Sequence, residues 1–265
     1  VSASHFHYDY DLTYQKFSVG MNMNFSKNPR SDIGRNLGFS YSYLEKDLKP
    51  NNQIDYAKYN LWNLNYSYSD RRMIHEKYLS GNLQWMEDFQ KISGEAFYRW
   101  EYAKDKKLSL RFFGGYFLTN KTKNSLFNYG ISRVSNYSFS YGLLGQSALS
   151  GILSQQLIIA EGGFKSYLGN SANQWITSVN VDSHVWRWFN VYADAGVYKN
   201  KNKSADFIWD SGVKVKVIPD FLEVYFPIQS SLGFEPGFKD YGQRIRFTLV
   251  LNFNAITGYF RRGWF

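Results

Sequence analysis

The chain contains no cysteine in its 265 residues. A disulfide framework and a thiolate metal site are therefore both excluded. Long hydrophobic runs are also missing, because the longest aliphatic clusters are LIIA and TLVL. These fall far short of the roughly 18 apolar residues that a transmembrane helix needs. If this chain enters a membrane, it must cross it as β-strands.

Proline is scarce as well, with five residues in the chain. Proline cannot donate a hydrogen bond to a β-ladder, so it is excluded from most strand interiors. All five prolines fall between the segments that we predict to be strands: Pro29, Pro50, Pro219, Pro227 and Pro236. Their positions agree with a chain built mainly from strands.

Positive charge and aromatic residues are abundant. The net charge is +9, and aromatic residues make up 20% of the chain. The charges are spread over many short segments, which favours a lipid surface or simple solubility over a nucleic-acid-binding stripe. The aromatic content exceeds what the core of a soluble protein usually requires.

Strict alternation of apolar and polar residues is the strongest local signal. In FSVGMNMNFS, from Phe17 to Ser26, every odd position is apolar and every even position is small or polar. This period of two predicts a strand with two different faces. Similar segments recur along the chain, and we predict about 12 strands at residues 3–14, 15–26, 37–43, 62–68, 73–86, 88–103, 106–118, 150–165, 172–184, 186–199, 204–217 and 244–254. A further strand at DFLEVYF (220–226) is an open alternative.

A membrane barrel and a soluble sandwich or lipocalin-like barrel share this pattern and differ in which face points inward. A Lys or Arg facing lipid near the midplane costs about 2–4 kcal/mol. The apolar faces of the predicted strands with the clearest alternation carry no charged residue; these strands are 3–14, 15–26, 37–43, 62–68 and 244–254. We therefore predict an all-β, antiparallel transmembrane β-barrel over residues 1–255, with an interfacial aromatic and basic tail at 256–265. The predicted lipid-facing residues are Phe17, Val19, Met21, Met23, Phe25, Leu64, Tyr66, Phe247, Leu249 and Leu251. The predicted lumen residues are Glu95, Arg99, Arg111, Asp194, Asp210, Lys214, Arg244 and Arg246.

The lengths of the connections predict an orientation. The two longest predicted connections, 119–149 and 218–241, follow odd-numbered strands. Bacterial outer-membrane barrels have long extracellular loops and short periplasmic turns. We therefore expect both termini to be periplasmic, and KNKNK (199–203) to form a basic periplasmic turn.

Candidate chemical sites are weak. HEKYL (75–79) departs from the zinc-protease pattern HExxH, because Leu79 replaces the second histidine. His5 and His7 share a predicted strand face with Asp9 and Asp11, which we interpret as a polar row rather than a metal site. Asp182 and His184 share a face near the predicted outer end of their strand and are the only candidates for a catalytic pair at the rim. We expect no catalytic, cofactor-binding or metal-binding residues, so the chain is not expected to be an enzyme.

Five stretches together resemble a known family region. They are RFFGGYFL (111–118), SQQLIIAEGGFKS (154–166), ANQWITSVNV (172–181), DSGVKVKVIPDFLEVYFPI (210–228), and QRIRFTLVLNF (243–253) before the RRGWF end. They resemble the C-terminal barrel region that follows the catalytic part of gluzincin (M1-type) metallopeptidases in Bacteroidota. The resemblance covers about the C-terminal 60% of the chain, and the zinc-binding HExxH of the family has no counterpart here.

The resemblance implies a membrane anchor or a subunit of a cell-surface complex in the outer membrane of a Gram-negative bacterium. Such a complex would be linked to a peptidase or to protein assembly or export. The expected partners are outer-membrane lipid, including lipopolysaccharide, and surface proteins bound by the long loops, with no nucleic acid. Two alternatives stay open: a small-solute channel, and a protease or lipase active at the rim.

Overall fold

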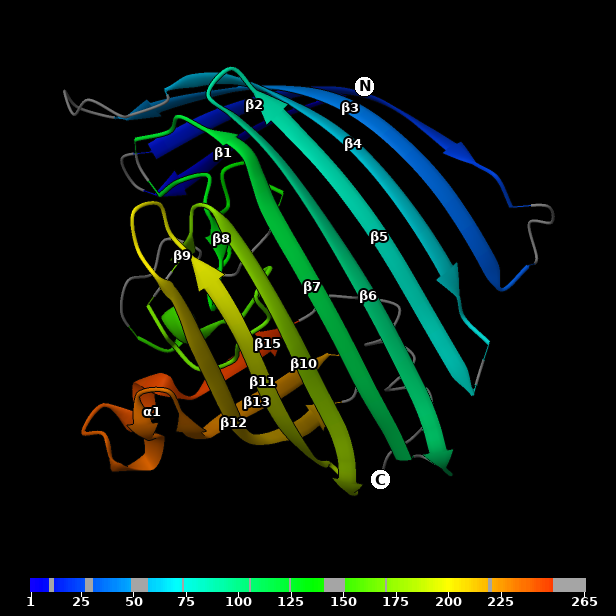
Figure 1. Ribbon diagram of the computed structural model, residues 1–265, viewed down its shortest axis with the longest axis vertical. Helices are drawn as coiled ribbons and strands as arrows, with labels where there is room; N and C mark the ends of the chain where they lie inside the picture. Colours follow the sequence, from blue (N-terminus) through cyan, green and yellow to red (C-terminus); the bar gives the residue numbers. More distant parts are fainter. Residues whose placement is uncertain are drawn as a thin grey trace.

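A computed structural model shows an all-β protein built around one large antiparallel sheet (Figure 1). The structure describes residues 1–9, 12–26, 31–48, 57–72, 74–104, 106–123, 125–140, 151–169, 171–218 and 221–249. None of the helices in this part of the chain has the length and apolar character needed to span a membrane.

The large sheet has 13 strands, and most neighbours in the sheet are also neighbours in the sequence. Most strands in this up-and-down order are joined by hairpins, as the alternating segments and the short polar connections between them predict. In sheet order the strands are β1 (Ser2–Asp9), β2 (Leu12–Asn24), β3 (Ile33–Leu48), β4 (Lys58–Asp70), β5 (His75–Met86), β6 (Phe89–Ala103), β7 (Lys106–Asn120), β10 (Trp175–Trp186), β11 (Phe189–Lys199), β12 (Ala205–Ile218), β13 (Leu222–Ser230) and β14 (Gly233–Phe234), with β15 (Arg246–Leu249) also paired to β13. The sheet is strongly curved, so that it has a convex and a concave face (Figure 1).

The connection between β7 and β10 is long and folds back against the concave face of the sheet (Figure 1). We call its described residues, 121–123, 125–140, 151–169 and 171–174, the insertion. It contains the 3-10 helix η1 (Ile152–Gln155) and a two-stranded sheet of β8 (Tyr129–Gly130) and β9 (Ser171–Ala172). The end of the sheet from which it departs is the insertion end. The opposite end, which carries the β4–β5, β6–β7 and β10–β11 connections, is the short-turn end.

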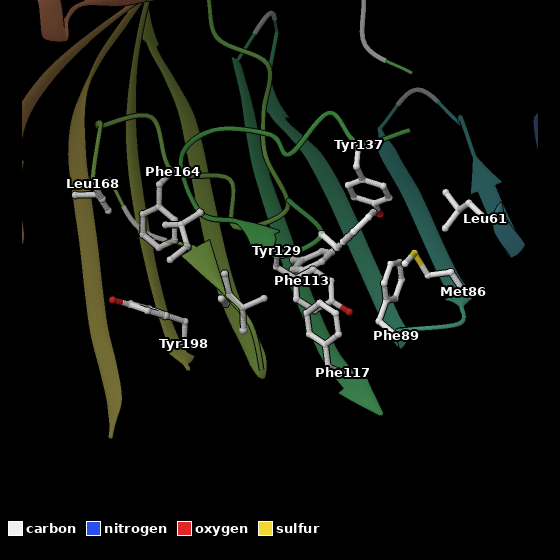
Figure 2. Packing of buried hydrophobic residues seen from close by; sticks show 14 of the residues in the cluster. Leu61, Met86, Phe89, Phe113, Phe117, Tyr129, Tyr137, Phe164, Leu168 and Tyr198 are labelled. Atoms are coloured by element: carbon white, nitrogen blue, oxygen red, sulfur yellow. The ribbon is translucent and has the colours of Figure 1, made fainter. Parts of the chain in front are cut away.

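The hydrophobic core lies between the insertion and the concave face. Phe127, Tyr129 and Phe164 of the insertion are almost fully buried, at 0%, 1% and 0% exposure. They belong to one cluster with Phe89 and Phe117 of the sheet (Figure 2). The core is therefore asymmetric, because the insertion covers part of the concave face while the convex face carries many exposed large apolar side chains.

Several sequence predictions need correction. Of the predicted strand at 150–165 the structure describes residues 151–165, and these do not form a strand, because η1 and coil of the insertion occupy them. The apolar LIIA cluster belongs to this insertion, and Leu157 is buried against Tyr192 and Tyr225. The open alternative at 220–226 is instead a strand, β13. The large sheet therefore has 13 strands among the described residues, against the roughly 12 that we predicted.

Pro227 lies within β13, whereas we predicted every proline to fall between strands. The ladder tolerates it because the β12–β13 register shifts between Ser211 and Gly212, next to the pairing of Gly212 with Pro227. On its other side, among the described residues, β13 pairs with β15 through residues 222–225 and with β14 through residues 229–230. Proline is found at such bulges and unpaired edges. The first hairpin also differs, because β2 begins at Leu12 and not at Gln15.

Within the described residues, no pairing joins β1 to β15, so closure of the sheet into a barrel is not seen. At the free edge of β15, Phe247 forms an isolated parallel bridge with Gln156 of the insertion, and Leu157 donates to the Phe247 carbonyl at 2.7 Å. The predicted tail at 256–265 and the predicted lipid-facing Leu251 lie outside the described residues.

Candidate functional site

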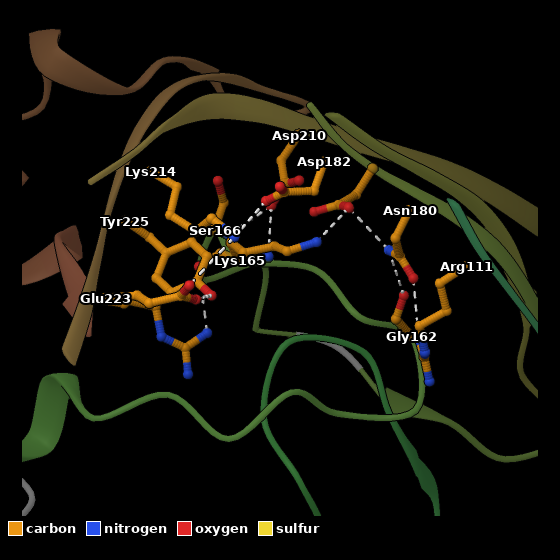
Figure 3. A network of polar contacts seen from close by, with 12 residues as sticks. Arg111, Gly162, Lys165, Ser166, Asn180, Asp182, Asp210, Lys214, Glu223 and Tyr225 are labelled. Carbon is orange, nitrogen blue, oxygen red and sulfur yellow. Dashed lines mark hydrogen bonds and ion pairs between the residues drawn. The ribbon is translucent and has the colours of Figure 1, made fainter. Parts of the chain in front are cut away.

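An extensive polar site joins the insertion to the concave face of the sheet (Figure 3). Its centre is the segment EGGFKS, residues 161–166. The Lys165 ammonium lies 2.5 Å from Asp194 Oδ1 of β11, and the two side chains are 9% and 0% exposed. A buried ion pair of this kind requires further hydrogen bonds to offset the loss of hydration.

Asp210 of β12 binds the backbone of the same segment. Its Oδ2 accepts from the backbone N–H groups of Lys165 at 2.9 Å and Ser166 at 2.5 Å. Asp194 and Asp210 are directly opposite each other in the β11–β12 ladder. Two neighbouring carboxylates on the concave face thus hold one lysine of the insertion through its side chain and its backbone.

Arg111 of β7 holds the preceding residues of the insertion. Its Nη1 donates to the Glu161 carbonyl at 3.0 Å and to Asn180 Oδ1 at 2.9 Å, and its Nη2 donates to Glu95 Oε2 at 2.7 Å. Asn180 of β10 donates in turn to the Gly162 carbonyl at 3.2 Å and to Asp194 Oδ1 at 2.9 Å. Arg111 and Asn180 therefore connect the Glu95 ion pair to the Lys165–Asp194 pair.

Arg246 of β15 holds the insertion from the other edge. Its Nη1 donates to the Ser132 carbonyl at 2.7 Å and to the Lys165 carbonyl at 3.4 Å, and the residue is 4% exposed. The segment is therefore held by β7, β10, β11, β12 and β15 together. Such a site is suited to fixing the position of the insertion within the curved sheet.

Gly163 is required where the insertion passes closest to this site. It has φ of +79°, and a Cβ there would lie 2.3 Å from Asn180 Oδ1 and 2.7 Å from Arg111 Nη1. Gly169 has a similar φ of +70° but open space around its Cβ position. Both glycines occupy a backbone region that other residues adopt only with strain, but only Gly163 also lacks room for a side chain.

We predict that Gly163→Ala destabilises the protein by about 3 kcal/mol, whereas Gly169→Ala costs only about 1 kcal/mol. The difference arises from the clash with Asn180 and Arg111, because the backbone strain is common to both variants. Urea unfolding followed by tryptophan fluorescence measures it. Equal losses in the two variants would show that close packing at residue 163 is unimportant.

A second polar group lies nearer the short-turn end and includes the predicted rim residues. The Lys214 ammonium is 2.6 Å from Asp182 Oδ2 and 3.6 Å from Glu223 Oε1. Asn190 donates to Asp182 Oδ1 at 2.5 Å, and its own Oδ1 is 3.2 Å from His184 Nδ1. Lys214 and Asn190 thus both contact Asp182. No described serine, threonine or cysteine is hydrogen-bonded to His184, as the nucleophile of a catalytic site would be.

Two predicted positions lie at the opposite end of the sheet from the one that we expected, because residues 151–165 do not form a strand. Asp182 and His184 lie at the end of β10 that carries the short β10–β11 connection, not at the end of the long loop. KNKNK (199–203) lies at the insertion end instead. There, Lys201 N donates to Asn173 Oδ1 at 2.7 Å, and Asn173 N donates to Asn200 Oδ1 at 2.7 Å.

Two other predicted lumen residues, Arg99 and Arg244, make ion pairs outside these two polar groups. Arg99 pairs with Glu76 at 2.6 Å on the concave face. Arg244, which we predicted on the last strand, instead ends the short helix α1 (Tyr241–Arg244) and contacts Glu235 at 3.0 Å and Asp240 at 3.1 Å. The hydrogen bond from Arg244 lowers the pKa of the Asp240 carboxyl.

The remaining sequence candidates do not form a site. His75 of HEKYL lies in β5 with its Nδ1 2.7 Å from the Tyr98 hydroxyl. The structure describes only the backbone of His5, His7 and Asp9, in β1, and Asp11 lies outside the described residues. Among the described residues, no three His, Cys, Asp or Glu side chains are grouped in a way that could hold a metal ion.

Sequence reasoning identified Arg111, Asp194 and Asp210 but missed Lys165, their partner on the insertion. No local signal marked it, because the Gly162–Gly163 pair of EGGFKS has a counterpart in Gly114–Gly115 inside β7. No known protein family matches the chain, and no curated protein matches it either. The site must therefore be interpreted from its own chemistry.

Proposed function

We propose that the chain forms an outer-membrane β-barrel that acts as a membrane anchor or as a subunit of a cell-surface complex. The exposed apolar surface of the convex face carries this proposal. Large side chains on this face include Met21 at 57%, Phe112 at 50% and Phe207 at 63% exposure. Contiguous apolar surface on this scale is unfavourable in water and marks contact with a membrane or a partner.

The distribution of charge supports contact with lipid. The outward rows of β6, β7 and β10 carry no charged residue from Ile92 to Trp100, from Leu108 to Leu118, or from Trp175 to Val185. Outward charges instead occur near strand ends, as in the Glu45–Lys58 pair. A band without charge between polar ends is the pattern of a transmembrane barrel.

The filled concave face favours an anchor over a wide channel. The insertion packs its aromatic residues against the sheet and is held by buried ion pairs. The resemblance of the chain to a barrel region of M1-type metallopeptidases supports a platform linked to a peptidase, placed in a Gram-negative outer membrane with its long loops toward surface partners. A small-solute channel would require a path past the insertion. We propose no hydrolase at the rim, because Asp182 is already paired with Lys214.

Single cysteines test the proposed orientation of the two faces, because the chain has none of its own. Val19 faces outward on β2 and is 42% exposed, while the Ser18 hydroxyl lies 2.9 Å from that of Ser42 on the other face. We expect a fluorophore on Val19→Cys to be quenched strongly by brominated lipids in vesicles, and one on Ser18→Cys to be quenched weakly.

Wild-type protein carried through the same labelling reaction is the control for background. Equal quenching at residues 18 and 19 would contradict a strand with one lipid-facing side. Weak quenching at both residues would place β2 away from lipid and return the chain to the soluble alternative.

A further inference from the structure

Asp194 and Asp210 form a buried pair of carboxyl groups between the sheet and the insertion. They are directly opposite each other in the β11–β12 ladder, they are 2% and 1% exposed, and their carboxyl groups lie within hydrogen-bonding reach of each other. Asp194 Oδ1 accepts from Lys165 at 2.5 Å and from Asn180 at 2.9 Å. Asp210 Oδ2 accepts from two backbone N–H groups of the insertion. One oxygen of each carboxyl is therefore fully partnered.

The other oxygen of each carboxyl receives no hydrogen bond. Asp194 Oδ2 and Asp210 Oδ1 are buried, and no described N–H or O–H group donates to either of them. Tyr192, on the same strand as Asp194, does not supply a donor, because its hydroxyl is also buried without a partner. Neither oxygen adjoins a space that could hold a water molecule. Because a buried carboxylate oxygen without a donor is unfavourable, the pair requires a hydrogen atom between its two facing carboxyls.

The nearby cations are directed elsewhere. Lys165 donates to the partnered oxygen of Asp194, and Arg246 donates to the carbonyls of Ser132 and Lys165. Two ionised carboxylates side by side in a buried site repel each other, whereas a proton on one of them lets that carboxyl donate to the other. The other described ionisable groups that face this region make no hydrogen bond or ion pair with either carboxyl: Tyr192, Tyr225, Tyr241, Asp182, Lys214 and Glu223.

We propose that Asp194 and Asp210 bind one proton between them at neutral pH, and that this proton helps to hold the insertion against the sheet. When the insertion leaves, water reaches both carboxyls, and an aspartate in water has a pKa of about 3.9 and is ionised at neutral pH. Opening therefore releases one proton. A rise in pH favours the open form, so the buried pair makes the closure of the concave side sensitive to alkaline conditions.

Infrared spectroscopy of the full chain in detergent tests for the proton, because a protonated carboxyl has a carbonyl stretch separate from the bands of an ionised carboxylate. We expect the wild type to show this band at neutral pH and Asp210→Asn to have lost it. Asparagine keeps an acceptor for the two backbone N–H groups and offers an amide hydrogen to Asp194, so the variant is expected to fold. Asp182→Asn is the matched control. Asp182 is an aspartate of the neighbouring strand that is paired with Lys214, so its replacement should keep the band.

Trypsin cleavage of the insertion tests the effect of pH. Lys123 and Arg133 are exposed cleavage positions in the insertion, and a denatured sample corrects for the pH dependence of the protease itself. Because opening releases one proton, we expect the corrected cleavage rate of the wild type to rise about tenfold per pH unit around neutral pH. Asp182→Asn should show the same rise. Asp210→Asn should be cleaved at a nearly constant rate, because it has no proton to release.

Three results would overturn the proposal: no protonated-carboxyl band in the wild type, persistence of the band in Asp210→Asn, or the same pH profile for the wild type and Asp210→Asn. If Asp210→Asn does not fold, the band and the pH profile of the wild type still decide, because the absence of either contradicts the proposal. The inference goes beyond the anchoring role and needs no membrane. Lipid quenching at residue 19 tests the membrane assignment separately, so the two proposals can fail independently.

Discussion

Replacing Met21 by arginine is expected to block assembly of the protein in the outer membrane, while Asn22→Arg is expected to assemble. Met21 is 57% exposed on the convex face of β2 and lies opposite Phe39 in the neighbouring strand. An arginine facing lipid near the bilayer midplane costs about 2–4 kcal/mol. This loss is a large part of the roughly 5–15 kcal/mol that stabilises a typical protein.

Asn22 is the control because it is adjacent in sequence and points to the opposite face. It is exposed on the concave side, close to the Gly38 position of β3, so a longer polar side chain has water to enter. Outer-membrane fractions would be compared by the heat-dependent mobility shift of folded barrels on gels. Similar yields of folded protein from both variants would show that the two faces of β2 do not differ in contact with lipid.

The two faces of the strands could be predicted from the sequence because each is encoded by residues close together. In β2 the alternation from Phe17 to Asn24 is unbroken, and the structure exposes Phe17, Val19, Met21 and Met23 on one side. A period of two is a local property of the chain. It therefore survives even where the predicted ends of the strand are wrong, as at Leu12.

The insertion could not be predicted because its structure depends on distant contacts. LIIA reads as an apolar strand segment, but Leu157 and Ala160 are buried in a loop that packs inside the curved sheet. The ion pair of Lys165 with Asp194 joins residues 29 positions apart, and Arg246 reaches Ser132 across 114 positions. No local pattern specifies such pairs, and a double glycine does not mark the insertion, because Gly114 and Gly115 lie inside β7.

One consequence of this missed element is the reversal of two predicted positions. Without a strand at 151–165, β10 becomes the strand that follows β7 in the sheet. Asp182 and His184 then move to the short-turn end, and KNKNK moves to the insertion end. Each residue lies in the strand or turn that we predicted. The end of the sheet at which it lies depends on the number of strands that precede it.

The second large effect is expected at the buried ion pair that holds the insertion. Lys165→Met removes the ammonium from Asp194 and leaves that carboxylate buried, directly opposite Asp210. Breaking one partner of a buried pair costs about 3–5 kcal/mol. We therefore expect the insertion to leave its place on the concave face, with faster protease cleavage after residues of the insertion such as Lys123 and Arg133.

Conductance in planar bilayers is the functional measurement for the same variant. The wild type is expected to show only small or rare steps because the insertion fills the concave side, while Lys165→Met is expected to show larger and longer openings. Large open steps in the wild type would favour the small-solute channel over the anchor, because they would show a path past an insertion that is still in place.

Two further variants separate the charge of Lys165 from general damage. Lys58→Met breaks the ion pair with Glu45, whose side chains are 63% and 35% exposed, and an exposed pair of this kind contributes only about 0–1 kcal/mol. This variant should therefore behave like the wild type. Lys165→Met combined with Asp194→Asn removes both charges and should recover part of the protease resistance, because no uncompensated carboxylate remains at residue 194. If the double variant is cleaved as fast as Lys165→Met, the buried charge of Asp194 is not what releases the insertion.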